Sequence, residues 1–446
     1  MIRTQTFNQH PARNHEHNRE PKRWTSVRNA FSALALVSLI NAASLAAASD
    51  TLLIQNATLY TAAPEETAAQ TNMDIRVEGG VITQVGEDLP TEGVAQVIDA
   101  AGRAVTPGVF GGIGRIGLEE IGLEKTTGDY AQRLEQMRPE FDVTLAFNPE
   151  AMSLGVHLKN GLTFSVLAPA SARGGSLVAG LGAATALDGR LPKGPRVMFV
   201  DLGGDANDLS GGSRAAQFML LRQAFVEAKA PNLVMVHDER LLSPSGRQVL
   251  VDFIKNQGVF VFDVDRAIDI QRTIDFARSE GVRAVIRGGA EAWRVAAQLA
   301  SAEIPVILDP LENLPYSFDS LGATLENAAR LHQADVQIAI SLRSPQVQDA
   351  GKTRQAAGNA VAHGLPWNVG LAAITRTPAE IFGVADQFGR ISVGRKADLV
   401  MWSGDPLDVS SLPDLVLSNG REHPLESRHS ALRDRHYERV RQGLAR

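Results

Sequence analysis

The feature that most constrains the fold of this chain is a rhythm of amphipathic helix followed by apolar strand, which begins near residue 145. Apolar runs such as LTFSVLAP, GVFVFDVDR and VRAVIRGG each follow a helical pattern. We expect these helices over residues 149–160, 213–229, 245–256, 267–280, 291–301 and 322–333. Repeated apolar strands with helical crossovers predict a parallel sheet covered on both faces. Roughly 280 residues of this rhythm suit a (β/α)8 TIM barrel.

Both ends of the chain have strand character of another kind. The segment MDIRVEGGVITQVG predicts a hairpin around Gly79 and Gly80, and strand patterns return over 388–420. Within the barrel, RGGSLVAG fits a hairpin insertion. We therefore expect an α/β protein in which a TIM barrel is joined to a small β-sandwich built from both ends. The expected boundaries are sandwich 49–105 with 388–426, barrel 106–387, and a polar tail at 427–446 that is solvated or forms a short helix.

The first 48 residues have the pattern of a secretory signal. A basic flank that includes Arg19 and Arg28 precedes an apolar stretch from Phe31 to Ala48, which ends in three alanines. This is the order of charged, apolar and small-residue regions in a signal peptide. Asn41 and several Ser and Ala residues make the stretch a poor permanent anchor. We expect an exported, periplasmic protein with no stable membrane insertion after cleavage.

Charge and cysteine content exclude several classes of function. Loss of six basic and two acidic residues with the signal leaves 38 basic and 48 acidic residues, a net charge of −10. An acidic surface of this kind disfavours nucleic acid as a partner. The chain has no cysteine, so thiolate catalysis and thiolate metal sites are excluded.

Two motifs resemble the amidohydrolase superfamily, and its imidazolonepropionase-like branch in particular. VIDAAGRAVTPGVFGGIGRIG resembles the segment that leaves the sandwich and forms the first barrel strand. AAITRTPAEIFGVADQFGRISVGRKADLVMWSGDPL resembles the last helices and the return into the sandwich. The resemblance implies hydrolysis of non-peptide C–N bonds, of the cyclic amide or amidine type, by water that a divalent metal activates.

The metal ligands of that family are replaced on the first strand. Its pattern Pro-Gly-x-x-Asp-x-His-x-His falls on residues 107–115, where Gly111, Ile113 and Arg115 occupy the ligand positions. Ile113 has no lone pair, and Arg115 does not lose its proton. At 4 Å and an effective dielectric near 20, a guanidinium opposes a divalent ion by about 8 kcal/mol. We therefore expect no metal at this site.

The other ligand positions implied by the resemblance are altered as well. Asp263 falls on the fifth-strand histidine, Gly288 or Gly289 on the sixth-strand histidine, and Arg343 on the eighth-strand aspartate. Asp349 follows six residues later, in an expected loop. Arg115 and Arg343, on the first and last strands and facing Asp263, suggest a salt-bridged plug in place of the metal. The same arginines are alternatively candidates for holding a ligand carboxylate.

Histidines offer little help to a metal site. His157, His332 and His363 fall in or beside expected helices, and we interpret them as surface or hydrogen-bonded helix residues. A second group, whose loose spacing fits a solvated tail, comprises His423, His429 and His436. His237 follows the apolar run NLVMV and precedes two acidic residues, so it is a candidate for the barrel mouth.

Three hypotheses follow. The first is a degenerate member, a pseudoenzyme without cofactor, which binds a small molecule or partners an amidohydrolase paralogue or a second copy of itself. The second is an active hydrolase with zinc or iron in a rebuilt site, for which Asp263, His237 and Asp349 are the catalytic candidates. The third is a structural periplasmic interaction protein. The sequence identifies no substrate.

Overall fold

A computed structural model describes residues 51–444, apart from 123, 135, 231, 233–239, 344, 345 and 427. The chain divides into residues 1–49 and 50–446, and every element below belongs to the second unit. The expected signal peptide lies outside the described residues.

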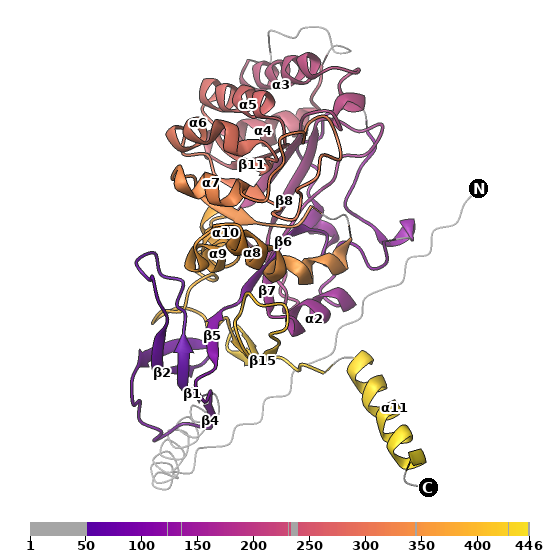
Figure 1. Cartoon of the computed structure of the whole chain (residues 1–446). Helices are drawn as coiled ribbons and strands as arrows, with labels where there is room; N and C mark the ends of the chain where they lie inside the picture. Colours follow the sequence, from indigo (N-terminus) through magenta and orange to yellow (C-terminus); the bar gives the residue numbers. More distant parts are fainter. Residues whose placement is uncertain are drawn as a thin grey trace, which may run out of the picture. The chain divides into compact units, whose positions relative to one another are not determined.

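The larger sheet has the predicted barrel order (Figure 1). Its eight strands follow one another in sequence, and all neighbours are parallel except at β8, which is antiparallel to both β7 and β9. This strand corrects the all-parallel sheet that the rhythm predicts and agrees with the hairpin insertion expected near residue 175. The strands are β6 (Val109–Gly114), β7 (Leu162–Leu167), β8 (Val178–Ala186), β9 (Arg196–Asp201), β10 (Val259–Val264), β11 (Arg283–Gly288), β12 (Val306–Leu308) and β13 (Ile338–Ile340).

The ends of this sheet meet through a side chain. The backbone N–H of Ile113 on β6 donates to Oγ of Ser341, just after β13, at 2.8 Å. Gly112 permits the approach, since its φ is +84° and a Cβ there would lie 2.9 Å from that same oxygen. The eight strands therefore form a nearly closed barrel.

Helices between the strands confirm four of the six predicted segments closely, whereas 291–301 begins as a 3-10 helix and the helix predicted at 322–333 begins only at Asn327. Ser213 and Ser243 cap two of them, each accepting a hydrogen bond from a backbone N–H in the first turn, and Gly281 ends a third in the left-handed conformation. Figure 1 shows α3 to α7 stacked along one side of the barrel sheet. The helices are α2 (Met152–Lys159), α3 (Arg214–Lys229), α4 (Pro244–Lys255), α5 (Ala267–Glu280), α6 (Ala296–Ser301), α7 (Asn327–Gln333), α8 (Thr353–Ala362), α9 (Trp367–Ala373) and α10 (Arg376–Ile381).

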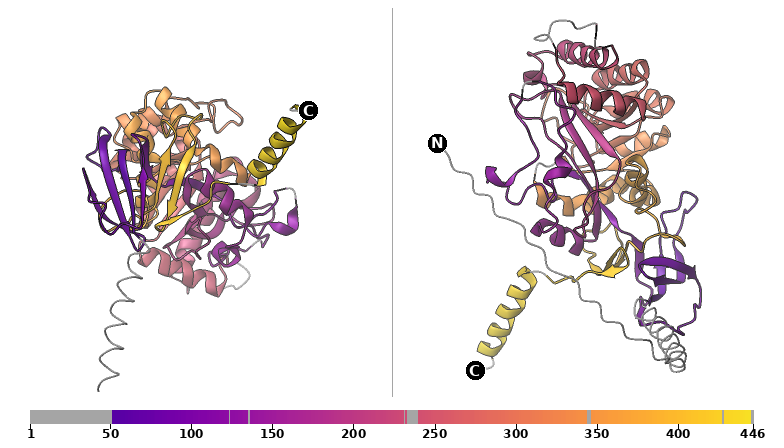
Figure 2. Two further views of the ribbon diagram at one scale, coloured as in Figure 1. Left: turned by 90° about the horizontal axis from the view of Figure 1, so that it is seen from below. Right: turned by 180° about the vertical axis from the view of Figure 1, so that it is seen from behind.

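A second sheet combines both ends of the chain, as predicted. Figure 2 shows its N-terminal strands beside the C-terminal ones, and the two sets join where β5 pairs antiparallel with β14. The Gly79–Gly80 hairpin joins β2 and β3 as expected. The strands are β1 (Thr51–Leu59), β2 (Gln70–Glu78), β3 (Val81–Gly86), β4 (Gln96–Asp99), β5 (Ala104–Pro107), β14 (Leu399–Trp402), β15 (Pro413–Ser418) and β16 (Arg421–Glu422).

The two sheets are connected at a tight corner. Gly108 donates its N–H to the carbonyl of Asp398 at 3.0 Å. A Cβ at Gly108 would lie 2.0 Å from Oγ1 of Thr163 and 2.5 Å from Oδ2 of Asp398, so glycine alone fits there. The Asp398 carboxyl accepts from Thr163 at 2.6 Å, and burial raises its pKa to about 7. The two motifs that resemble the amidohydrolases thus touch each other at this corner.

The polar tail contains helix α11 (Arg428–Leu444). Among the helices of the described residues, none has both the length and the apolar character needed to cross a membrane.

Candidate functional site

Alternation along the barrel strands places charged side chains directly above the apolar interior. Phe199, Val261 and Val285 pack in the buried cluster inside the barrel. Side chains two residues further along a strand point to the same face, which places Asp201, Asp263 and Arg287 in the next layer toward the carboxyl ends. Asp263 is the ladder partner of both Asp201 and Arg287. The barrel mouth is therefore lined by acidic and basic groups on adjacent strands.

Arg343 lies at the centre of this mouth. Its guanidinium contacts Asp263 at 2.7 Å and Asp265 at 2.5 Å, and Glu312 lies 3.9 Å away. The backbone N–H of Arg343 donates to Asp309 at 3.1 Å, which fixes the start of the loop after β13. Burial lowers the pKa of Arg343, but the nearby Asp263 and Asp265 outweigh it and raise that pKa overall. The guanidinium is thus a permanent cation with only 17% of its side chain exposed.

Gly288, at the end of β11, provides the room for this guanidinium. A Cβ at Gly288 would lie 2.6 Å from Nη1 of Arg343 and 2.6 Å from Oδ1 of Asp265. Its φ of +90° also lies in the region that side-chain-bearing residues avoid. In the resemblance to the amidohydrolases, the histidine of the sixth strand aligns with Gly288 or Gly289. Where that family would supply an imidazole, this chain has the guanidinium of Arg343, from the loop after β13.

The residues at the mouth do not fit a divalent metal. Guanidinium groups have no lone pair to donate, and the first-strand positions hold Gly111, Ile113 and Arg115. In the described part of the chain, no three His, Asp or Glu side chains are grouped so as to hold a metal ion. The Asp263 carboxylate faces two arginines, which occupy the space that a cation would need.

Burial raises the pKa of several carboxyl groups around Arg343. The pKa of Asp201 rises to about 6, first through burial and then through the charge of Asp263, against hydrogen bonds from Ser171 and the charge of Arg287. Burial raises the pKa of Glu312 to about 7, although Arg343 opposes the rise. The pKa of Asp265 is also raised by burial, again opposed by Arg343. The cluster therefore gains negative charge as the pH rises through the neutral range.

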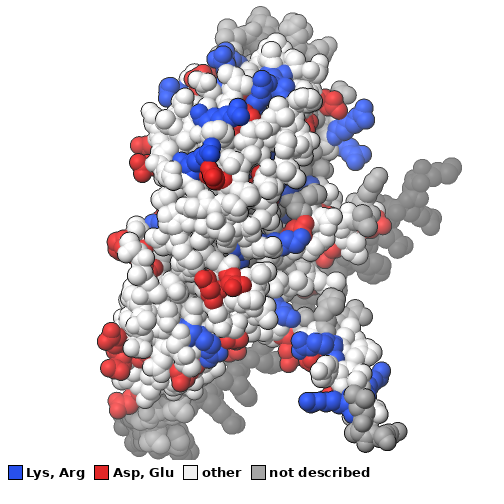
Figure 3. All heavy atoms as spheres, viewed as in Figure 1, with Lys and Arg blue, Asp and Glu red and all other residues white. Residues whose placement is uncertain are grey.

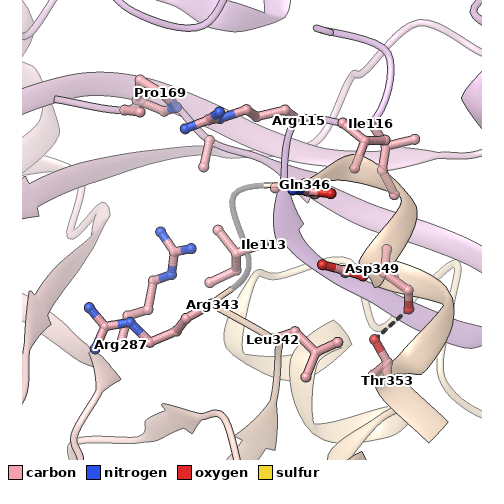
Figure 4. Close-up of a pocket in the computed structure, with 16 residues that line it drawn as sticks. Ile113, Arg115, Ile116, Pro169, Arg287, Leu342, Arg343, Gln346, Asp349 and Thr353 are labelled. Atoms are coloured by element: carbon pink, nitrogen blue, oxygen red, sulfur yellow. Dashed lines mark hydrogen bonds between the residues drawn. The ribbon is translucent and has the colours of Figure 1, made fainter. Parts of the chain in front are cut away.

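Arg343 separates two cavities. A cavity of about 300 Å³ lies on one side, and its lining includes six aspartates: Asp201, Asp205, Asp208, Asp263, Asp265 and Asp319. A cavity of about 130 Å³ lies on the other side, and its lining includes Arg115, Arg287 and Arg343. Figure 4 shows Arg287 and Arg343 on one side of the smaller cavity, with Asp349 and Thr353 across from them. We call these the acidic chamber and the arginine chamber.

The predicted plug is correct in one contact and wrong in another. Arg343 does contact Asp263, as expected from the first and last strands. Arg115 does not complete the plug. Its guanidinium pairs with Glu119 at 3.4 Å and lies 3.6 Å above the ring of Tyr130. Strand β6 ends at Gly114 and the chain then turns, with the N–H groups of Leu118 and Glu119 both donating to the carbonyl of Arg115. Arg287 takes the second basic position, 3.6 Å from Asp263.

The other predicted site residues fall in several places. Gly111 and Ile113 line the arginine chamber with Asp349, which pairs with Lys352 at 2.7 Å. Asp349 lies in a 3-10 helix, Val347–Lys352, and not in the irregular loop that was expected. His237 lies outside the described residues.

Of the helical histidines, His157 is buried on α2 and not at the surface, and burial lowers its pKa to about 4. His332 lies in α7, and the ring of His363 lies 2.8 Å from the carbonyl of Asn359.

Sequence reasoning missed Arg287, Asp265 and Glu312. Arg287 carries a usable signal, since it follows the inward-facing Val285 by two residues and so must face the mouth. Asp265 and Glu312 lie in connecting segments beyond the strands, where alternation says nothing about direction. Their role depends on the position of Arg343, which comes from a distant part of the chain.

Comparisons with known proteins agree with this architecture. Residues 218–424 match the model of the amidohydrolase family. The crystal structure of an amidohydrolase from Thermotoga maritima MSB8 is similar with a TM-score of 0.73 at 24% identity, over 83% of this chain and 99% of that one. A second amidohydrolase crystal structure is similar with a TM-score of 0.53 at 17% identity, over 84% of this chain and 100% of that one.

A curated relative matches over a short segment. Amidohydrolase tasK of Hapsidospora irregularis is 40% identical over 58 residues, which is 13% of this chain and 6% of that protein. The chain thus spans only a small part of the length of the curated relative that it matches.

Proposed function

We propose that this chain, which belongs to the amidohydrolase superfamily, binds a small molecule at its barrel mouth and holds no resident divalent metal there. The superfamily barrel is kept, and the resemblance points to an ancestry in the hydrolysis of non-peptide C–N bonds. In this proposal the metal-dependent chemistry has been lost, and the protein is a binding protein in the exported compartment expected from its N-terminal segment.

One observation carries the proposal. The guanidinium of Arg343, held by Asp263 and Asp265, fills the space beside Gly288 where a metal and its imidazole ligand would lie. A divalent ion there would have to displace an arginine that is paired with two carboxylates. Removing one partner from a buried ion pair costs about 3–5 kcal/mol, so the displacement is strongly opposed.

Two other functions receive less support. An active hydrolase with a rebuilt site would need the carboxylate of Asp263, which already contacts two arginines. It would also need His237, which lies outside the described residues. Two further alternatives are a purely structural interaction protein and pairing with an amidohydrolase paralogue or a second copy. Neither would explain the two chambers at the mouth.

Surface charge supports a small-molecule ligand over nucleic acid. On the face in Figure 3, basic and acidic side chains lie in small separate groups and not in one basic field. Binding of a phosphate backbone needs such a field.

Elemental analysis tests the proposal. The mature chain, expressed with zinc, iron and manganese in the medium and then dialysed, should retain well below one equivalent of each metal. An Arg343→Asp variant is the matched comparison, since it removes the guanidinium and adds a potential ligand in the same place. Stoichiometric metal in the wild-type protein that survives dialysis would overturn the proposal, and hydrolysis of cyclic amides by that protein would favour the active-hydrolase alternative.

A further inference from the structure

We infer that the arginine chamber binds the carboxylate of a short monocarboxylic ligand, with Arg287 as its principal contact. This inference rests on the proposed function and adds the chemical class of the ligand. The chamber is the cavity of about 130 Å³ between β6, β7 and the segment after β13.

Arg287 has hydrogen-bonding capacity that the protein does not use. Its Nε is buried, and among the described residues no atom accepts a hydrogen bond from it. Its ion pair with Asp263 is long, at 3.6 Å, while the other carboxylate oxygen of Asp263 lies 2.7 Å from Arg343. Arg287 lines the arginine chamber, and 19% of its side chain is exposed, so an acceptor in that cavity can meet a guanidinium whose own ion pair is long. A carboxylate suits a guanidinium because two parallel N–H donors match its two oxygens.

Arg115 sets the charge on the opposite part of the chamber. It lies beside Pro169 in Figure 4, and its stacking on Tyr130 together with its ion pair to Glu119 fixes its guanidinium. Only 22% of the Arg115 side chain is exposed. An arginine that is already ordered by its neighbours loses little side-chain entropy when an anion binds.

Charges facing the chamber favour an anion. Three arginines line it, and the acidic side chain in its lining is Asp349, which already pairs with Lys352. The carboxylates that neutralise Arg343 lie on the acidic side of that residue, at Asp263 and Asp265. The side chains that line the arginine chamber therefore carry more positive than negative charge.

The size and remaining lining of the chamber restrict the ligand. A cavity of roughly 150 Å³ holds benzene, so this one takes a ligand of about six non-hydrogen atoms. Apolar side chains of Ile113, Ile116 and Leu342 form part of the wall. A carboxylate with a short aliphatic chain, such as propionate or butyrate, satisfies both the arginines and this wall. A dicarboxylate would bring its second charge against apolar carbon or Asp349.

Isothermal titration of the mature protein with propionate and butyrate, at constant ionic strength set with chloride, tests the inference. We expect saturable binding, weaker binding of benzoate because of its size, and weaker binding of succinate because of its second charge. Inorganic phosphate tests whether any oxyanion binds. It should bind less well than propionate, because it has no apolar group to pack against the apolar wall.

Matched variants locate the site. Arg287→Met should weaken propionate binding by at least about tenfold, the effect of one charged hydrogen-bonding group, and Arg115→Met should weaken it less. Arg272→Met, on the exposed face of α5, is the control and should bind as the wild type does. Propionate binding that survives both Arg287→Met and Arg115→Met, or phosphate binding as tight as that of propionate, would overturn the inference.

The outcome is separable from that of the proposed function. A metal-free protein that binds no monocarboxylate keeps the proposed function and overturns only the ligand class. A protein with stoichiometric metal overturns the proposed function whatever it does with propionate.

Discussion

The two chambers at the barrel mouth share Arg343 but differ in how their charges are matched. In the acidic chamber, carboxylates outnumber cations, and burial raises the pKa of Asp201 to about 6 and also raises that of Asp265. In the arginine chamber, cations outnumber carboxylates, and guanidinium groups cannot lose their charge to relieve the imbalance. Buried carboxyl groups can relieve their repulsion by binding protons, whereas buried guanidinium groups can be matched only by anions, from the protein or from a ligand. This difference makes the arginine chamber the better candidate for a ligand.

Replacement of Arg343, the residue that the two chambers share, should have the largest effect on stability. Arg343→Met leaves Asp263 and Asp265 without their principal cation, and we expect the free energy of unfolding to fall by about 3–5 kcal/mol near neutral pH. The loss should shrink in acid, where the abandoned carboxyl groups become protonated. Urea denaturation followed by circular dichroism, at neutral pH and near pH 5, measures both effects.

Arg287→Met is the matched control for that experiment, because Arg287 lies in the same place but has poorer pairing. Its long contact with Asp263 should be worth less than about 1 kcal/mol, since Asp263 keeps Arg343 as a partner. Equal losses of stability in the Arg343→Met and Arg287→Met variants would show that the two arginines are equivalent and would remove the basis of the comparison.

Gly288→Ala would place a methyl group in the space that the Arg343 guanidinium occupies between the two chambers. The new methyl group would lie 2.6 Å from both Arg343 and Asp265, at a φ of +90°, so we expect a loss of about 2–4 kcal/mol in unfolding free energy from strain and overpacking. The same denaturation measurement detects it.

Gly281→Ala separates the two causes of that loss. Gly281 has a φ of +70°, and no atom lies within 4 Å of the position that a methyl group would take there, so only the backbone cost of about 1 kcal/mol applies. If both substitutions cost the same, the space beside Gly288 is not filled by Arg343 in solution.

Much of the fold could be predicted because it depends on local patterns. Strand β10 and helix α5 follow from alternation and from apolar periodicity within a dozen residues. Strand β8 departs from the parallel rule, and the Gly-rich segment before it indicated a hairpin. The contact of Gly108 with Asp398 brings together two motifs that lie far apart in the sequence, and only the folded chain shows why each is needed.

The residues of the candidate site could be predicted best where they lie on a barrel strand, because alternation along the strand shows which side chains face the mouth. Asp263 and Gly288 could be located because they follow from the register of β10 and β11. The partner of Arg115 was mispredicted because β6 ends at Gly114, one residue before it, and a strand pattern does not show where the following residue points. Arg287 was missed because the family pattern marks the position of an imidazole ligand at the end of β11 and not the inward-facing residue beside it.

Glu312, which lies 3.9 Å from Arg343, gives the smallest expected effect and tests the acidic cluster around that arginine. Burial raises its pKa to about 7 in the folded protein, above the ordinary value of 4.5, so the folded state binds its proton more tightly than the unfolded state does. The stabilising contribution is therefore complete below about pH 4.5 and is lost as the pH rises toward 7. Because part of the side chain is exposed, we expect about 1–2 kcal/mol of unfolding free energy to be lost across this range.

Glu312→Gln should remove that part of the pH dependence, since the amide does not titrate. Relative to the wild type, the variant should gain about 1–2 kcal/mol in unfolding free energy between pH 5 and pH 8. Glu326→Gln on α7 is the control, because Glu326 is largely exposed and should leave the profile unchanged. Wild-type and Glu312→Gln profiles that run parallel would mean that Glu312 binds no proton in this pH range. The contrast with the arginine chamber would then rest on Asp201 and Asp265.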